Sequence, residues 1–313
     1  MSPSDHATSA TKSPIPLEGN ILGIIFMLIA VTAGVITSLI VKNLSPLATL
    51  MVMLTVRFLF SLPFIGAAAY AKRKRNFLDI TRWDILTMRV ITGHIGIMFW
   101  FLSVAHTSLG QATALFQSSA IFVTVLSPLI LREKVGIYRG SAVLMGLIGI
   151  VMITNPFGDA LNIGSLYGLG SALAGAFLVV VLRMLGRTEE PVSVALWHNI
   201  IGVIIYPVAV IFMVEMDVLV MMISNHLGAL FLLGFAATFV QIGFTSAYRH
   251  GEAAALAPIR YLSVPMAAIL GYLIWSEDLS MVEITGMVIV VSSCVFISYR
   301  EYRLAKQSIP PLN

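Results

Sequence analysis

Ten apolar segments, each long enough to cross a membrane, follow one another along the chain and constrain its fold more than any other feature. A helix that crosses a bilayer needs about 20 mostly apolar residues. Such segments run near 20–41, 46–71, 83–105, 109–131, 138–154, 163–185, 192–214, 227–248, 253–275 and 282–299. Apolar residues make up 58% of the chain and charged residues 11%, against about 45–50% and about 25% in soluble proteins. The sequence therefore predicts an all-α integral membrane protein with ten transmembrane helices.

The distribution of Lys and Arg predicts how these helices are oriented. If the N-terminus is cytoplasmic, fifteen of the 19 basic residues fall in cytoplasmic segments, and only Lys42 falls on the other side. The positive-inside rule favours this orientation, which leaves both termini in the cytoplasm. Residues 1–18 and 301–313 are predicted to be cytoplasmic tails, the first of them disordered because it is rich in Ser, Thr and Pro. Topology also explains the net charge of +4, so no nucleic-acid partner is expected.

An internal repeat divides the chain into residues 19–155 and 156–300. A shift of about 145 residues aligns the pairs Gly19/Gly164, Gly23/Gly168, Pro46/Pro191, Pro63/Pro207 and Glu133/Glu277. Each half then holds five helices, and because five is odd, the second half must be inverted relative to the first. Inverted repeats are typical of transporters that bind substrate between the two halves.

The ends of the fourth and ninth segments carry the most specific motifs. The first half reads LREKVGIYRGSAVLMGLIGIVMI after SSAIFVTVLSPLI, and the second reads AAALAPIRYLSVPMAAILGYLIWSEDLSMVEITGMVIVV. On these motifs the chain resembles, over roughly residues 19–299, the tandem EamA-type domains of the drug/metabolite transporter superfamily. The similarity is greatest to the subgroup of bacterial S-adenosylmethionine, riboflavin and organic-anion carriers. One departure is Ile121, which stands where the second half has Pro265, and it leaves open whether the two helices bend alike.

The resemblance implies an inner-membrane carrier with a central cavity. Its walls would be helices three, four, eight and nine, with parts of one, two, six and seven. The superfamily moves chemically diverse small molecules, so the resemblance does not identify the substrate.

One face of the fourth helix is small and weakly polar, and it has a counterpart on the ninth helix. The fourth-helix face is Thr113, Gln117, Ala120, Thr124 and Ser127, and the shift of 144 gives the ninth-helix face Ala257, Tyr261, Val264, Ala268 and Tyr272. Helical spacing puts each set on one side of its helix. These faces either line a cavity or pack closely; the size of Gln117 and Tyr261 favours a cavity.

Arg260 is the sharpest candidate for a substrate contact, because an Arg within a span is costly and no acidic residue lies at similar depth in a neighbouring span. Its guanidinium is predicted to bind a substrate carboxylate, with Tyr261 and Gln117 beside it. The alternative is that Arg260, about 10 Å from the cytoplasmic start of its helix, extends its side chain to the membrane surface. Arg57 is predicted to be structural, and Arg89 to extend to the nearby membrane edge.

Further polar and aromatic side chains within the spans complete the predicted site. They are His94, Trp100, Phe101, Thr124, Trp197, His198, Asn199 and Gln241. The two histidines titrate near neutral pH, so they could relay protons, although a buried His that bonds a carbonyl is commoner. Because no Asp or Glu lies in the middle of a span, facilitated exchange or uniport is favoured. Glu133 and Glu277 are predicted to cap the helices that follow them, with a gating ion pair as the second interpretation.

These observations predict a secondary transporter that moves a small carboxylate-bearing or zwitterionic metabolite by alternating access. The alternatives are transport of a larger aromatic or nucleoside-like compound, such as S-adenosylmethionine or riboflavin, and a non-transporting structural or regulatory role. The sequence has no phosphate-binding loop, nucleophile elbow or zinc motif and only one cysteine, Cys294. We therefore predict no enzymatic activity, no ATP, no cofactor and no metal. The predicted partners are a small-molecule substrate, the lipid bilayer and, as one further assembly, a second copy in a homodimer.

Overall fold

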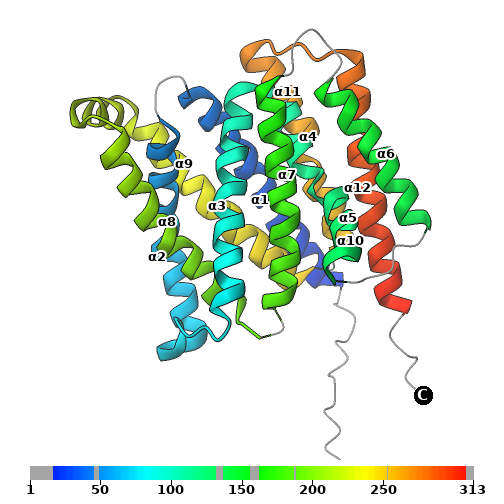
Figure 1. Cartoon of the computed structure of the whole chain (residues 1–313), viewed down its shortest axis with the longest axis horizontal. Helices are drawn as coiled ribbons and strands as arrows, with labels where there is room; N and C mark the ends of the chain where they lie inside the picture. Colours follow the sequence, from blue (N-terminus) through cyan, green and yellow to red (C-terminus); the bar gives the residue numbers. More distant parts are fainter. Residues whose placement is uncertain are drawn as a thin grey trace, which may run out of the picture.

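The computed structural model describes residues 17–45, 49–131, 137–155, 162–186, 188–251 and 253–307, which fold into a helical bundle without strands (Figure 1). The first half forms α1 (Leu17–Leu44), α2 (Leu50–Arg73), the short 3₁₀ helix η1 (Lys74–Asn76), α3 (Trp83–His106), α4 (Leu109–Gln117), α5 (Ser119–Leu131) and α6 (Ile137–Thr154). The second half forms α7 (Ile163–Leu185), α8 (Pro191–Met213), α9 (Met216–His250), α10 (Ala253–Tyr261), α11 (Ser263–Trp275) and α12 (Met281–Gln307).

Within the described residues, nine helical stretches are long and apolar enough to cross a membrane. The predicted fifth span corresponds to a shorter apolar helix, Gly140–Thr154. The ten-span count and the cytoplasmic location of both termini therefore stay predictions. The helix α9 is longer than its predicted span because it begins at Met216 and continues through a kink at His226, whose φ and ψ are −124° and 18°.

The fourth and ninth segments are each interrupted near the middle. The first breaks at Ser118, between α4 and α5, and the second breaks at Leu262, between α10 and α11. Pro258 and Pro265 flank the second break, as expected for residues that remove a helical hydrogen bond. At the first break the Ser118 hydroxyl donates to the carbonyl of Leu115 at 2.6 Å, a local bond that competes with regular helix. Both central helices are therefore interrupted despite the Ile121 departure.

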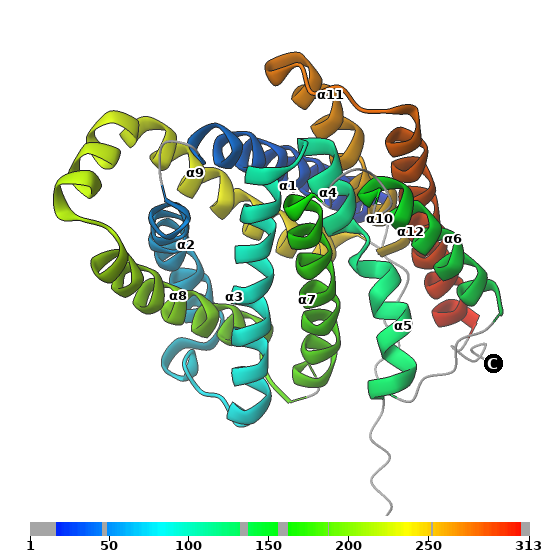
Figure 2. The same ribbon diagram turned by 45° about the horizontal axis from the view of Figure 1, so that its top comes forward.

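The helices pack in pairs that join the two halves. The main pairs are α1 with α9, α3 with α7, α2 with α8, and α6 with α12. In Figures 1 and 2, α2 and α8 lie on one side of the bundle and α6 and α12 on the other. In the repeat, α1, α2, α3 and α6 are equivalent to α7, α8, α9 and α12. Exchanging the two repeats therefore turns the pair α1 and α9 into the pair α7 and α3, and it leaves the other two pairs unchanged. The packing thus has the pseudosymmetry of the repeat.

Contacts at one end of the bundle show that equivalent helices run in opposite directions. Lys42, at the end of α1, donates through Nζ to the carbonyl of Thr107 at 2.6 Å. Asn162 caps the start of α7 and donates to the hydroxyl of the same Thr107 at 3.2 Å. The helix α1 therefore ends where its counterpart α7 begins, as an inverted repeat requires.

Candidate substrate cavity

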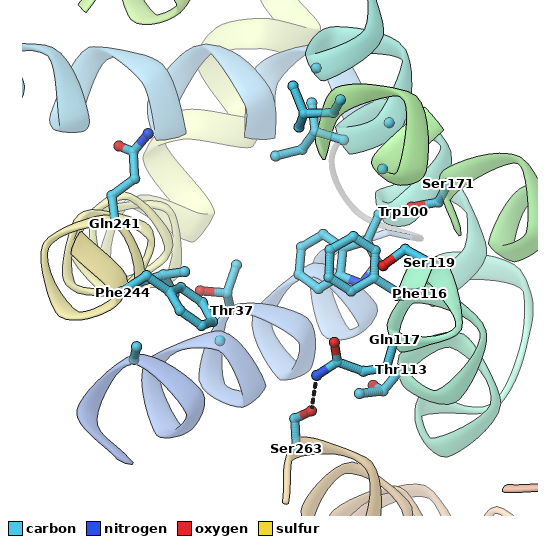
Figure 3. A pocket seen from close by; sticks show the side chains of 18 of the residues that line it. Thr37, Trp100, Thr113, Phe116, Gln117, Ser119, Ser171, Gln241, Phe244 and Ser263 are labelled. Atoms are coloured by element: carbon cyan, nitrogen blue, oxygen red, sulfur yellow. Dashed lines mark hydrogen bonds between the residues drawn. The ribbon is translucent and has the colours of Figure 1, made fainter. Parts of the chain in front are cut away.

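A cavity of about 350 Å³ lies in the middle of the bundle and is lined by both halves (Figure 3). Its walls come from α1, α2, α3, α4, α5, α7, α8, α9, α10 and α11, which correspond to the helices that the resemblance implied. The cavity exists because small residues face it from several helices, namely Ala30, Gly34, Gly93, Gly96 and Gly175. Its volume is near the lower end of ligand sites, which suits a small metabolite.

The two interrupted helices meet at one side of this cavity. Gln117, the last residue of α4, donates through Nε2 to the Ser263 hydroxyl at 2.8 Å (Figure 3). The same Nε2 donates to the Arg260 carbonyl at 3.1 Å. Its Oε1 accepts from Nε of Arg260 at 3.1 Å. A break in a membrane helix frees backbone groups that must find partners inside the protein, and the Gln117 amide supplies one. Arg260 and Gln117 thus form one polar unit across the two halves.

Arg260 is surrounded by polar and aromatic groups. Its guanidinium carbon lies 6.0 Å from the centre of the Phe244 ring, and it also interacts with Tyr248. Among the described residues, no Asp or Glu forms an ion pair with Arg260. Gln117 accepts from the Nε–H of the guanidinium, and Tyr248 also bonds this side chain. The remaining N–H groups of Arg260 are the groups to be tested as substrate contacts.

Arg89 lines the cavity and is only 9% exposed. The prediction that its side chain extends to the membrane edge is wrong, because an apolar cluster packs around the part of α3 that precedes Arg89. Ile85 and Leu86, one turn earlier on α3, pack there with Val181 of α7 and Val194 of α8. The guanidinium is instead directed inward, about 9 Å from the start of α3 at 1.5 Å per residue.

The Arg89 guanidinium lies beside Gly93 and His198. A Cβ atom at position 93 would be 2.4 Å from Nη1 of Arg89 and 3.0 Å from Cε1 of His198, so the glycine makes room for both groups. Nε and Nη1 of Arg89 and Nδ1 of His198 have no hydrogen-bond partner in the part of the chain that the structure describes. The described residues therefore leave these buried polar groups beside the cavity unpaired.

The two predicted histidines pack against each other across the halves, with their rings tilted by 36°. Their ring centres are 4.3 Å apart, and Nδ1 of His94 is 3.1 Å from the Tyr206 hydroxyl. The Phe58 ring packs against both imidazoles and against Tyr206. His198 faces the cavity, whereas His94 lies behind it. Arg57 also lines the cavity and interacts electrostatically with both histidines.

Two further predicted residues line the cavity. Trp100 packs against Phe116 with their ring centres 5.8 Å apart, and Gln241 lies across the cavity from this pair (Figure 3). Nε1 of Trp100 and Oε1 of Gln241 have no partner among the described residues. An aromatic surface and an amide therefore face the same space as the arginines.

The remaining predicted residues lie outside the cavity lining. Phe101 and Asn199 are fully buried, and Asn199 donates to the carbonyl of Ala195 at 2.8 Å. Thr124 donates to its own helix, and Tyr261 packs in an apolar cluster. Trp197 lies at the start of α8, where Nε1 donates to the carbonyl of Leu78 at 2.9 Å. Contact of these five side chains with substrate stays a prediction.

Sequence reasoning missed Arg89 as a cavity residue, together with Phe116, Ser171 and Phe244. One signal was available, since Gly93 follows Arg89 by one helical turn and leaves space on the same face. The Phe116 and Phe244 rings resemble ordinary lipid-facing or core residues in sequence, so only packing distinguishes them.

A polar network joins the two halves at the end of the bundle where α1 ends. Glu277 forms an ion pair with Lys42 and accepts from the backbone nitrogen of Leu109 at 2.8 Å. Gln111 donates to Glu283 in the same region. Glu277 therefore caps α4, and the prediction that it caps the following helix is wrong, because Glu283 bonds Ser280 at the start of α12. Glu133 lies outside the described residues.

The opposite end of the bundle has its own contacts between the halves. The Glu189 carboxylate accepts from the backbone nitrogens of Thr81 and Arg82 at 3.0 and 2.9 Å. Lys72 pairs with Glu190 at 2.6 Å, and the adjacent ammonium lowers the pKa of the Glu190 carboxyl below its ordinary value. Each end of the bundle thus has bonds that join the first half to the second.

The sequence model of the EamA-like transporter family matches residues 17–155 and 162–299. The chain belongs to the EamA-like transporter family. It is 27% identical over 250 residues to the S-adenosylmethionine uptake transporter of Rickettsia prowazekii, covering 78% of this chain and 81% of that protein. It is 28% identical over 253 residues to the riboflavin transporter of Rhizobium johnstonii, covering 79% and 78%.

A third relative is the pseudopaline exporter CntI of Pseudomonas aeruginosa, which is 26% identical over 215 residues, 68% of this chain and 74% of that one. A solved crystal structure with 15% identity aligns with a TM-score of 0.58 over 90% of this chain and 96% of the other, which supports the fold alone. This EamA-family protein is a membrane transporter with tandem EamA repeats and is a multi-pass protein of the bacterial inner membrane.

Proposed function

We propose that this protein is a secondary transporter that moves a small carboxylate-bearing or zwitterionic metabolite by alternating access. One observation carries the proposal. The cavity is lined by Arg57, Arg89 and Arg260, and by no Asp or Glu among the residues that the structure describes. An unpaired guanidinium away from water is costly, and a bound carboxylate offsets that cost through paired N–H···O bonds.

The packing of the two halves supports alternating access. The cavity lies between them, and each end of the bundle has its own set of polar contacts between the halves. Rocking one half against the other would break one set while the other stays closed. The lack of carboxylates in the described cavity lining favours facilitated exchange or uniport. The adjacent His94 and His198 are the groups for the alternative, proton coupling.

A second candidate substrate is a larger aromatic compound, as the names of two relatives indicate. Trp100 and Phe116 present their rings to the cavity, and such rings stack on planar ligands. The three arginines argue against a ligand of net positive charge, so riboflavin fits this candidate better than S-adenosylmethionine does.

Counterflow in proteoliposomes tests the proposal. Proteoliposomes that contain the purified protein are loaded with an unlabelled compound. The same compound is then added outside in radiolabelled form. The compounds are amino acids, mono- and dicarboxylates, riboflavin and S-adenosylmethionine. We expect exchange of a carboxylate-bearing compound, and weaker affinity in Arg260→Ala but not in Arg249→Ala, a control at an exposed site on α9. Unchanged affinity in Arg260→Ala would remove Arg260 from the site. Exchange of riboflavin alone would support the second candidate, and exchange of none would favour the non-transporting role.

A further inference from the structure

The cationic groups of the cavity form two separate clusters. One is Arg260 with Gln117, on α10 and α4. The other is Arg89 with His198, on α3 and α8, and Arg57 acts on it electrostatically. The helix α3 packs mainly against α7, whereas α10 packs against α1 and α12, and the two helices stand apart in both views of the bundle (Figures 1 and 2).

The two clusters differ in how many of their polar groups have hydrogen-bond partners within the protein. Arg260 has a bond from Nε to Gln117 and an aromatic neighbour in Phe244. Arg89 is at least nine-tenths buried, yet its Nε and Nη1 have no partner among the described residues, and the same holds for Nδ1 of His198. A guanidinium presents its N–H groups in a planar fork that matches the two oxygens of a carboxylate. Arg89 is therefore a buried cation of the cavity lining whose Nε and Nη1 donors the described residues leave unpaired.

The charge of the cavity also favours a ligand that contacts both clusters. One carboxylate in contact with Arg260 would leave the Arg89 cluster without a counter-charge, because the described lining contains no acidic side chain. An arginine without a partner in low dielectric is costly. A ligand with anionic groups at both of its ends would place one negative charge at each cluster.

We propose that Arg89 and His198 form a second anion site opposite Arg260 and Gln117, and that the substrate is a dicarboxylate held between them. This inference rests on the proposed function, since it specifies which carboxylate-bearing compounds the cavity takes. Gly93 is a positioning residue of this site, because any side chain there would displace the Arg89 guanidinium.

Binding of a ligand series to the full-length protein in lipid nanodiscs tests the inference. The probes are glutarate, adipate and pimelate, each beside the monocarboxylate of equal chain length. We expect one dicarboxylate to bind at least about tenfold more tightly than its monocarboxylate, since one charge-assisted contact contributes about that factor. Arg89→Gln should abolish the preference for the dicarboxylate, whereas Arg249→Gln, at an exposed site on α9, should keep it. Arg89→Lys keeps the charge without the fork and should lose part of the preference.

Two results would overturn the second site. One is a wild-type protein that binds each monocarboxylate as tightly as its dicarboxylate, a measurement that needs no variant to fold. The other is an Arg89→Gln protein that keeps the full preference. If monocarboxylates or amino acids are still exchanged by the wild type in either case, the proposed function stands and only the second site fails. If no carboxylate binds or exchanges, the proposed function fails as well.

Discussion

The ion pair between Lys42 and Glu277 predicts how easily one end of the bundle opens. It joins the end of α1 to the segment after α11, and the Glu277 carboxylate also accepts from the Leu109 nitrogen at the start of α4. Glu277→Gln keeps an oxygen for the Leu109 bond and removes the charge that attracts Lys42. The substitution therefore weakens the contact between the halves without deleting a side chain.

The structure allows the size of this effect to be estimated. The Lys42 and Glu277 side chains are 15% and 12% exposed. Exposed pairs contribute about 0–1 kcal/mol, whereas removing one partner of a buried pair costs about 3–5 kcal/mol. This pair lies between those limits, so we expect about 2 kcal/mol, which raises the ratio of open to closed molecules by about 30-fold.

Pulsed electron paramagnetic resonance measures that ratio. Spin labels at Asn43→Cys and Asp278→Cys would flank the pair at exposed positions, in a Cys294→Ala background that removes the single native thiol. We expect Glu277→Gln to increase the population at long label-to-label distances at the expense of the short one. Lys42→Met should also increase the long-distance population. The double variant should increase it little more than either single variant does, because both substitutions remove the same interaction.

A distance distribution that Glu277→Gln leaves unchanged would refute this reasoning. So would additive effects of Lys42→Met and Glu277→Gln. Glu190→Gln serves as the control, because the Lys72–Glu190 pair lies at the opposite end and is about half exposed. This substitution should change the ratio of open to closed molecules at the labelled end by less than about twofold.

Three further predictions concern the cavity and the opposite end. Gly93→Ala should reduce dicarboxylate affinity more than monocarboxylate affinity in a titration, because its Cβ would lie 2.4 Å from Nη1 of Arg89; equal losses would contradict this. Gln117→Ala removes three hydrogen bonds between the halves and should lower the free energy of unfolding in lipid by about 2 kcal/mol, at about 0.6 kcal/mol per bond. The pKa of Glu190 is lowered by Lys72, so this pair stabilises the fold at neutral pH and loses its effect as the pH falls through the lowered pKa. The melting temperature of Lys72→Met should therefore be lower than that of the wild type at neutral pH and approach it in acid. A difference in melting temperature that does not change with pH would contradict the assignment.

Much of the site depends on which helices lie next to each other. Gln117 and Arg260 were both predicted from sequence, because a large polar side chain within an apolar segment is conspicuous. Their mutual hydrogen bonds were not, because 143 residues separate them along the chain. The position of Arg89 in the third segment, taken alone, predicts a side chain at the membrane edge. The cluster of Ile85, Leu86 and Val181 that keeps it from the surface forms only when α3 packs against α7.

The sequence by itself determined the class of the protein, its tandem repeat and its family, because these depend on the length and spacing of apolar segments and on local motifs. Only the tertiary structure decided that the fourth and ninth helices break opposite each other, that Glu277 caps α4, and that Arg57, Arg89 and Arg260 share one cavity. The physical reason is that hydropathy acts residue by residue along the chain. The environment of a buried charge is set by side chains that folding brings together from distant helices.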